Sequence, residues 1–405
     1  MKNNKCEMCY GGIVMDTNME TSESLFENTV SSLKYGIEHM DGVELDLRMC
    51  SDKQLVLHHD TSLMVDNPEK NGFNKWTENN SSDVMKEIGF HTLDDLFSEN
   101  DFLNMWHDFG KLVCFEMKLP HPRSGLAGGW KRGANAFNYA KEMYSLLEDK
   151  ISETGMQGSS KIIFSFYPKI SNVADSINSN IQTATLEPHV RQWGNSIIQK
   201  LVALPGFASS TLFSLARNAK RRNSPIIGCG LEYFLFPTNM VRFGRSVSLK
   251  GYGLNRLKKA RAGLPIFVWP TPLEIEKSMI NAGITCISDN VGSNYTTLPT
   301  GEIRWQRIAT QPVTPEYKKI FLESEKEEHS SLIKEAENDL PMWVELNKSE
   351  KVAQLDVWKK EGYWGNESKS ILEKLNENAI PWQIPRMIAH RGAGITGRPN
   401  GWWKK

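Results

Sequence analysis

The chain has 405 residues, well above the common domain size, so a single small module is excluded. Hydrophobic residues make up 40%, charged residues 24% and aromatic residues 10%, which is typical of a globular protein with a substantial core. Lys and Arg total 48 and so do Asp and Glu, so no overall field favours nucleic acid or an anionic bilayer. We therefore expect no nucleic-acid partner, and any site for a polyanion to be local.

The first residues contain no apolar stretch of the kind that a secretory signal needs, and no run of 18 apolar residues occurs. We therefore expect a cytoplasmic protein without integral membrane association. Six scattered cysteines are too sparse for a disulfide scaffold. Cys6 and Cys9 form a CxxC pair, but no second ligand pair for zinc accompanies it, so we interpret it as incidental.

The first predicted helix precedes residue 41. Its apolar face is formed by Phe26, Val30, Leu33, Ile37 and Met40, at spacings of three and four residues. Asp41-Gly42 ends this helix, and a strand is predicted directly after it, over 43–47.

Short apolar segments separated by helix-length stretches continue to residue 300. The further predicted strands are 54–58, 112–117, 161–166, 183–186, 226–231, 265–269 and 284–288. This α/β alternation favours a (β/α)₈ TIM barrel over an open doubly wound sheet, because no glycine-rich phosphate turn occurs. Segments 119–160 and 187–225 exceed ordinary loops, so each is expected to carry a helix or an excursion over the barrel mouth.

Composition changes near residue 300. From 316 to 380 the chain is rich in Lys and Glu in helix-type runs, which predicts a mostly helical appendage with solvated charged faces. The sequence RMIAHRGAGITGRPN then follows at 386–400, apolar at first, then basic and glycine-rich.

Two carboxylate-bearing strands are the first candidates for chemistry. Glu44 and Asp46 lie two residues apart, so their side chains leave the same face of a strand. Such a pair suits a hard cation, although acidic alternation on a strand is also typical of a solvated sheet face. Glu116 and Lys118 repeat the spacing at the end of another strand, where the alternative is an exposed ion pair. Together these residues predict a metal site with an ammonium group beside it.

Histidines follow two apolar segments. His58 and His59 come directly after a predicted strand, and parity does not decide which of them points inward. His390 and Arg391 follow Met387-Ile388-Ala389 and offer an imidazole and a cation for phosphate, with glycines after them that serve either a ligand approach or a plain turn.

Taken together, these segments resemble the sequence blocks of a known family. The blocks that carry this resemblance, in chain order, are Glu-Asn-Thr at 27–29, GVELDLR at 42–48, QLVLHHDTSL at 54–63, HTLDDLF at 91–97, CFEMK at 114–118, IIFSF at 162–166, PIFVW at 265–269 and AGITCISDN at 282–290. Their order and spacing resemble the glycerophosphodiester phosphodiesterase family. The resemblance implies a phospholipase-C-like TIM barrel that uses a divalent cation, Ca²⁺ or Mg²⁺. It also matches the family's His-Asp-x-x-Leu to His59, Asp60 and Leu63.

The chain departs from the family at its first block, a strand that normally ends in His-Arg-Gly shortly before Glu-Asn-Thr. No histidine precedes Glu27, and the block stands instead at 388–394 as IAHRGAG. We therefore predict a circular permutation in which the C-terminus supplies the first barrel strand. The predicted parts are 1–298 as the main barrel, 299–385 as a helical tether and 386–405 as the completing strand. Alternatives are a truncated tandem domain near 386, a strand exchanged within a dimer, and a degenerate strand at 11–15.

The resemblance also implies a role for each candidate residue. Glu44, Asp46 and Glu116 would bind the cation, and His59 and His390 would share general acid and base work. The substrate-binding residues would be Arg391 and Lys118 at phosphate oxygens, Glu27, and Trp269 at the glycerol pocket. Core packing is an equal alternative for Trp269.

The implied reaction is hydrolysis of a small glycerophosphodiester to glycerol 3-phosphate and an alcohol. One alternative is a lysophospholipase D-like or sphingomyelinase D-like lipid phosphodiesterase, since the stretch 197–216 is apolar enough to touch lipid, although a buried helix pair explains it as well. Another is a non-catalytic barrel that acts as a binding module, if the His-Arg strand does not dock.

Overall fold

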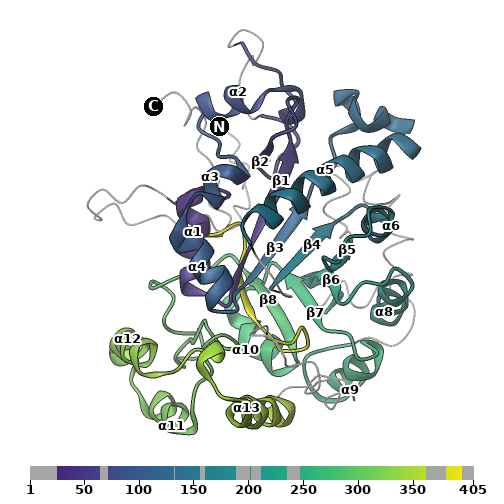
Figure 1. Ribbon diagram of the computed structural model, residues 1–405. Coiled ribbons are helices and arrows are strands. Elements are labelled where there is room, and N and C mark those ends of the chain that lie inside the picture. The colour runs from purple at the N-terminus through teal and green to yellow at the C-terminus, as the bar shows by residue number, and fades with distance from the viewer. Residues whose placement is uncertain are drawn as a thin grey trace, which may run out of the picture.

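Eight parallel strands form a closed barrel surrounded by helices (Figure 1). The structure is a computed structural model, and it describes residues 25–63, 72–131, 133–155, 160–187, 201, 211–234, 247–361 and 380–394. The barrel strands are β1 (Gly42–Met49), β3 (Leu112–Met117), β4 (Lys161–Ser165), β5 (Thr183–Glu187), β6 (Ile227–Gly230), β7 (Ile266–Trp269), β8 (Ile284–Ser288) and β9 (Met387–Ala389). The predicted TIM-barrel fold is confirmed.

The strand from the C-terminal part of the chain closes the ring, as the sequence predicted. β9 pairs in parallel with β8, where Ile388 lies opposite Ile287, and with β1, where Ile388 lies opposite Gly42. In Figure 1 this yellow segment runs between β8 and β1. The alternative strand at 11–15 lies outside the described residues, and the position between β8 and β1 is filled by β9.

One predicted strand does not belong to the barrel. The segment predicted at 54–58 forms β2 (Leu55–Leu57), which pairs antiparallel with the end of β1, Leu57 opposite Leu47. The physical reason is the tight turn after β1, in which the amide of Cys50 donates to the carbonyl of Gln54 at 2.8 Å. A chain that reverses so sharply returns beside the strand it has left, whereas a parallel neighbour needs a long crossover.

Helices cover the outside of the barrel. Their bounds are α1 (Val30–His39), α2 (Ser82–Glu87), α3 (Leu93–Phe97), α4 (Asn100–Asp108), α5 (Gly133–Glu153), α6 (Ile170–Ser176), α8 (Leu212–Arg221), α9 (Gly251–Ala260) and α10 (Leu273–Asn281). Short 3₁₀ turns η2 (Thr77–Asn79), η3 (Pro122–Ser124) and η4 (Leu126–Lys131) lie in the loops. The long segment 119–160 therefore carries a helix and an excursion, and 187–225 carries α8, both as predicted.

The layers follow from alternation along the strands. Val43, Leu45 and Leu47 of β1 pack in one cluster with Leu33 and Ile37 of α1, between barrel and helices. A second cluster fills the barrel interior with Leu112, Cys114, Ile162, Phe164, Ala184, Leu186, Ile226, Phe267, Ile287 and Ile388.

The predicted helical tether packs at the end of the barrel where the strands begin. It contains α11 (Pro315–Glu323), α12 (His329–Asp339) and α13 (Lys348–Glu361), drawn green at the lower end of Figure 1. A buried ion pair attaches it to the barrel, since Arg304 donates to both carboxylate oxygens of Glu276 at 2.7 Å. We call this end the floor of the barrel and the opposite end, where the strands finish, the mouth.

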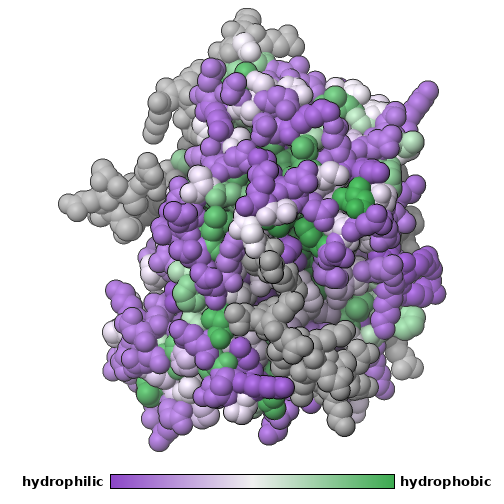
Figure 2. Space-filling view, viewed as in Figure 1, coloured by the Kyte–Doolittle hydropathy of each residue, from purple (hydrophilic) through white to green (hydrophobic). Residues whose placement is uncertain are grey.

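Hydrophilic residues cover most of the face seen in Figure 2, and hydrophobic residues form small patches on it. Among the described helices, none has the length and apolar character needed to cross a membrane. Four of the cysteines are free and buried, and the CxxC pair at Cys6 and Cys9 lies outside the described residues.

Candidate active site

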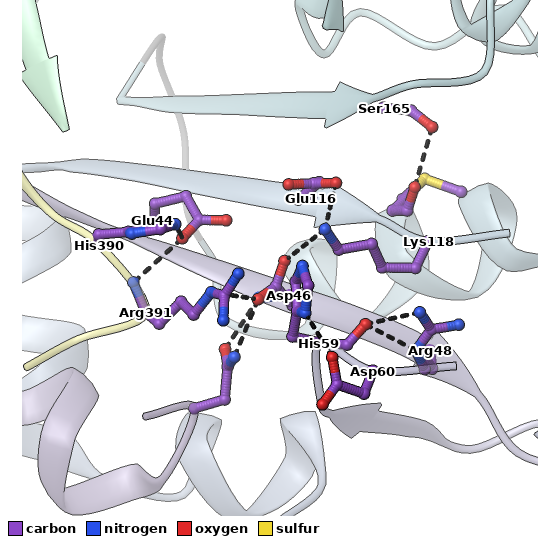
Figure 3. A network of polar contacts seen from close by, with 12 residues as sticks. Glu44, Asp46, Arg48, His59, Asp60, Glu116, Lys118, Ser165, His390 and Arg391 are labelled. Carbon is purple, nitrogen blue, oxygen red and sulfur yellow. Dashed lines mark hydrogen bonds and ion pairs between the residues drawn. The ribbon is translucent and has the colours of Figure 1, made fainter. Parts of the chain in front are cut away.

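Three carboxylates converge inside the mouth of the barrel. Glu44 and Asp46 point inward from β1, and Glu116 lies directly opposite Asp46 on the neighbouring β3. One oxygen from each carboxylate lies within 4.8 Å of the other two, and all three residues are buried (Figure 3). The strand alternation that sends Val43 and Leu45 to the helices therefore gathers the acidic side chains on the inner face.

Two cations lie against these carboxylates. The Lys118 ammonium forms an ion pair with Asp46 at 3.0 Å and another with Glu116. The Arg391 guanidinium lies 3.2 Å from Asp46 and also contacts Glu27 at 3.1 Å. Asp46 is thus held between two positive groups.

The chain after β9 brings His390 and Arg391 to the site in a tight turn. Arg391 has a left-handed backbone (φ 49°), and its amide donates to Glu44 at 3.0 Å. Gly392 follows with φ 88°, and a Cβ there would lie 2.5 Å from the backbone of Ser32. A glycine is therefore required for the turn to pass α1. The His390 ring donates a hydrogen bond through Nδ1 to the Asp289 carboxylate at 2.6 Å, and its Nε2 lies 3.9 Å from Glu44.

The other histidine comes from the chain after β2. His59 Nδ1 lies 2.8 Å from the Asp60 carboxylate. Its carbonyl accepts hydrogen bonds from Arg48 at 2.6 and 3.1 Å, and Arg48 in turn pairs with the buried Glu78. His58 is buried and packs edge-on against Phe90 at 4.5 Å between ring centroids. Of the two neighbouring histidines, the structure therefore brings His59 to the site.

A cavity of about 820 Å³ opens in front of these groups. Predicted site residues in its lining are Glu44, His59, Glu116, Lys118, Trp269, His390 and Arg391. The Trp269 ring meets Phe166 edge-on at 6.0 Å and forms part of the wall. Glu27 is not among the lining residues, and its carboxylate contacts the guanidinium of Arg391.

Burial and neighbouring charges shift the pKa values of the three carboxylates in different directions. Burial raises the pKa of Glu44 to about 8, with the Asp46 carboxylate adding to the shift. Burial also raises the pKa of Glu116. Burial would raise the pKa of Asp46 too, but Lys118, His59 and Arg391 outweigh it and hold that pKa well below its usual range. Glu44 therefore loses much of its charge at neutral pH, and burial opposes the charge of Glu116, unless a further cation stabilises them.

The two imidazoles shift in opposite directions. Burial, together with the charge of Lys118, lowers the pKa of His59 to about 4, so this ring is neutral at pH 7. Burial also disfavours the charged form of His390, but Asp289 outweighs it and the pKa of His390 lies above its usual value. The site thus places one proton acceptor and one group that keeps its proton to higher pH around one cavity.

The donor set fits a hard divalent cation. Carboxylate oxygens are the preferred ligands of Ca²⁺ and Mg²⁺, and three of them meet here. Asp46 Oδ1 and Glu116 Oε1 are buried, and both lie at ion-pair distance from the single ammonium of Lys118.

Three supporting residues were not singled out from the sequence. Asn28 donates to Asp46 Oδ2 at 2.9 Å and accepts from the amide of Asp46, also at 2.9 Å. Asp289 orients His390, and Arg48 holds the His59 carbonyl. All three stand within the sequence blocks quoted above, but their roles depend on contacts across the barrel that no local pattern contains.

Comparison with known families bears on the N-terminal half of the barrel. Residues 20–186 match the model of the Glycerophosphoryl diester phosphodiesterase family. No protein of curated function matches the chain.

Several solved structures are similar to this chain. A glycerophosphodiester phosphodiesterase from Thermotoga maritima is 17% identical, covers 64% of this chain and 87% of its own, and superposes with a TM-score of 0.38. A phosphodiesterase from Oleispira antarctica, solved with the product sn-glycerol-3-phosphate, is 11% identical, covers 64% and 86%, and has a TM-score of 0.41. A third, from Silicibacter pomeroyi, is 12% identical, covers 62% and 80%, and has a TM-score of 0.40.

Proposed function

We propose that this chain, a member of the glycerophosphodiester phosphodiesterase family, hydrolyses glycerophosphodiesters to glycerol 3-phosphate and an alcohol. One observation carries the proposal. His59, from the chain after β2, and His390, from the strand at the far end of the sequence, line a single cavity with Glu44, Glu116 and Lys118.

The cationic side chains would bind the phosphodiester. Lys118 and Arg391 both line the cavity and lie within 3.2 Å of the Asp46 carboxylate. A phosphate oxygen in the cavity would meet an ammonium and a guanidinium whose positions are already fixed by ion pairs. Preorganised charge of this kind stabilises the negative charge that grows on phosphorus oxygens in the transition state.

The two histidines would move the protons. One imidazole removes the proton from the attacking hydroxyl or water, and the other protonates the alcohol that leaves phosphorus. Each ring is oriented by a carboxylate at Nδ1, Asp60 for His59 and Asp289 for His390. This arrangement directs the Nε2 atom of each ring to the proton transfer.

Glu44, Asp46 and Glu116 would hold a divalent cation, Ca²⁺ or Mg²⁺. When bound, such a cation supplies Lewis-acid stabilisation of the phosphate charge. Asn28 would keep Asp46 in place by its two hydrogen bonds, and the amide of Arg391 would do the same for Glu44.

A second candidate is a lipid phosphodiesterase that releases an alcohol with an acyl chain. The observation that favours it is the apolar wall of the cavity, formed by Phe164, Phe166, Tyr167, Pro168, Leu186, Trp269, Pro270 and Ile287. The docked β9 argues against the third possibility, a non-catalytic binding module, because that reading required the His-Arg strand to stay away from the mouth.

Product analysis tests the proposal. The purified protein is incubated with glycerophosphocholine, glycerophosphoethanolamine or lysophosphatidylcholine, each with and without chelator. We expect glycerol 3-phosphate from the first two substrates, loss of product with EDTA, and recovery when Ca²⁺ or Mg²⁺ is added back. Choline from lysophosphatidylcholine alone would favour the lipid phosphodiesterase.

Glu44→Gln is the matched variant, because it keeps the shape of the side chain and removes its charge. Full activity of Glu44→Gln, or of a metal-free preparation, would contradict the proposed cation dependence. No hydrolysis of any of the three substrates by the metal-loaded wild type would contradict the proposed reaction.

A further inference from the structure

An exposed aromatic cluster stands on the loops at the barrel mouth. Trp76 and His121 stack face to face, with ring centroids 4.7 Å apart and an interplanar angle of 3°. Trp130 meets the edge of His121 at 6.2 Å and remains 74% exposed. A tryptophan so exposed, yet anchored to other rings, presents a large amphipathic surface to whatever lies outside the protein.

The loop that presents Trp130 is ordered by its own hydrogen bonds. Ser124 donates to the carbonyl of His121 at 2.8 Å, and Asn79 reaches across from the neighbouring loop to the carbonyl of Ser124 at 3.4 Å. Ala127, Gly128 and Gly129 then take three left-handed backbone conformations in succession directly before Trp130. The loop that carries Trp130 is therefore already ordered before any partner binds, so binding loses less conformational entropy.

Within the described loops 72–80 and 119–131, the exposed charged side chains are all positive. Residues 119–131 contain Arg123 and Lys131, both exposed, and no Asp or Glu. Lys75 lies 5.5 Å above the Trp76 ring. Of the acidic groups in the described residues nearby, the buried Glu78 is paired with Arg48, and Asp60 contacts His59 in the lining of the cavity. The loops thus form a basic, aromatic surface on a chain whose overall charge is zero.

The cavity opens on the same side. The loops that carry Trp76 and Trp130 follow β2 and β3, and Leu119 of the second loop lines the cavity. Directly after the next strand, β4, the residues Phe166, Tyr167 and Pro168 continue the apolar wall, and the exposed Lys169 follows them. A flat partner that rested on Trp130 would therefore face the opening of the cavity.

We propose that loops 72–80 and 119–131 form a docking surface for a phospholipid bilayer that contains anionic lipids. Trp130 enters the headgroup region, where tryptophan is favoured, and Lys75, Arg123 and Lys131 face the anionic headgroups. Of the two tryptophans in the cluster, only Trp130 is widely exposed, whereas single-stranded nucleic acid is bound by several exposed rings on which successive bases stack, so the surface fits a bilayer better. This inference goes beyond the proposed hydrolysis and does not depend on it, because binding is measured without turnover.

Co-sedimentation with vesicles tests the docking surface. The full chain is mixed with vesicles of phosphatidylcholine alone or of phosphatidylcholine and phosphatidylserine in equal parts, at low and at high salt. We expect sedimentation with the phosphatidylserine vesicles, weaker binding at high salt, and little binding to phosphatidylcholine alone. A wild-type chain that stays in the supernatant with both vesicle types would overturn the proposal and leave the surface to a protein partner.

Two variants separate the aromatic and the basic contributions. Trp130→Ala should weaken partitioning about tenfold, because the buried area of the ring is lost. Arg123→Gln combined with Lys131→Gln should weaken it roughly 25-fold, since each cation contributes about fivefold near an anionic surface. Leu322→Ala is the matched control, because Leu322 is 76% exposed but lies on α11 at the floor.

All variants should keep the thermal midpoint of the wild type and its activity on a water-soluble substrate, because Trp130, Arg123 and Lys131 do not line the cavity. Equal vesicle binding by Trp130→Ala and wild type would overturn the role of the ring. A loss in Leu322→Ala as large as in Trp130→Ala would overturn the assignment to the mouth.

Discussion

Buried carboxylates lie near the floor and the mouth of the barrel along β1, but their binding partners differ between the two ends. At the floor, Asp41 is fully buried and receives hydrogen bonds from the amides of Ala309, Thr310 and Met387 and from the Thr310 hydroxyl, all at 2.7 to 2.9 Å. Both of its oxygens are satisfied. Asp41 thereby joins β1, the helical tether and the strand β9 in one hydrogen-bonded unit.

At the mouth, Glu44, Asp46 and Glu116 meet one another, and Asp46 and Glu116 are balanced by ion pairs with side chains rather than by a set of backbone amides. Buried carboxylates in contact repel one another, and a cation bound between them offsets that repulsion. The difference teaches that a carboxylate held by backbone amides fixes the fold, whereas a cluster of carboxylates held by side-chain cations has the composition that a divalent cation requires. The floor holds β9 in place so that the mouth receives His390.

The largest expected effect concerns the histidines of the mouth. His59→Ala and His390→Ala should each lower kcat by roughly two to four orders of magnitude, which is the usual contribution of a general acid or base. Steady-state kinetics on a soluble glycerophosphodiester measures this. His58→Ala is the control and should change kcat little, because His58 packs against Phe90 away from the cavity.

An essential His58 beside a dispensable His59 would contradict this reading of the site. Mixing the His59→Ala and His390→Ala chains adds a second check. Because β9 closes the barrel of its own chain, the mixture should be no more active than its components. Recovery of activity would mean that the strand is exchanged between subunits.

A substitution at the floor should lower the stability of the fold rather than the rate of the reaction. Asp41→Asn turns one hydrogen-bond acceptor into a donor that faces backbone amides, which should lower the free energy of unfolding by about 3 kcal/mol. Chemical denaturation followed by circular dichroism measures the loss. Asp101→Asn is the matched control, since the Asp101 side chain is 83% exposed. Equal stability of Asp41→Asn and wild type would show that the floor does not hold β9.

A smaller effect is expected from Lys111, which donates to the carbonyls of Ile37 and Glu38 near the end of α1. Burial, with the charge of Arg307 adding to it, lowers the pKa of Lys111 to about 7, whereas an unfolded lysine titrates near 10.4. Between these values the unfolded chain binds more protons, so stability should rise with pH above about 7.

The expected gain is about 1 kcal/mol between pH 7 and pH 8. The Lys111→Met variant should lack this contribution, so the difference in unfolding free energy between wild type and variant should change by that amount over the same range. Denaturation curves of both proteins at the two pH values measure it. Parallel pH dependences would contradict a buried, readily deprotonated lysine.

The sequence predicted the barrel well because strand and helix periods are local properties. All seven ring strands before β9 overlap segments predicted from apolar runs, and His-Arg-Gly at 390–392 identified the eighth. The segment 54–58 was wrong as a barrel strand, because its antiparallel return depends on the turn at 50–53 rather than on its own apolar pattern.

The sequence also predicted some residues of the candidate site and missed others. Glu44 and Asp46 follow from strand parity, but the choice of His59 over His58 needed the family resemblance, since the chain leaves the strand before either residue. Asn28, Asp289 and Asp41 could not be assigned from the sequence, because each acts through hydrogen bonds to residues far away in the chain.

Calorimetric titration of Mg²⁺, and separately of Ca²⁺, tests the contrast between mouth and floor most directly. The wild type and Asp101→Asn should bind a divalent cation, whereas Glu44→Gln and Glu116→Gln should bind it at least about tenfold more weakly. Absence of binding by the wild type, or undiminished binding by Glu44→Gln, would contradict the claim that the mouth carboxylates are arranged for a cation.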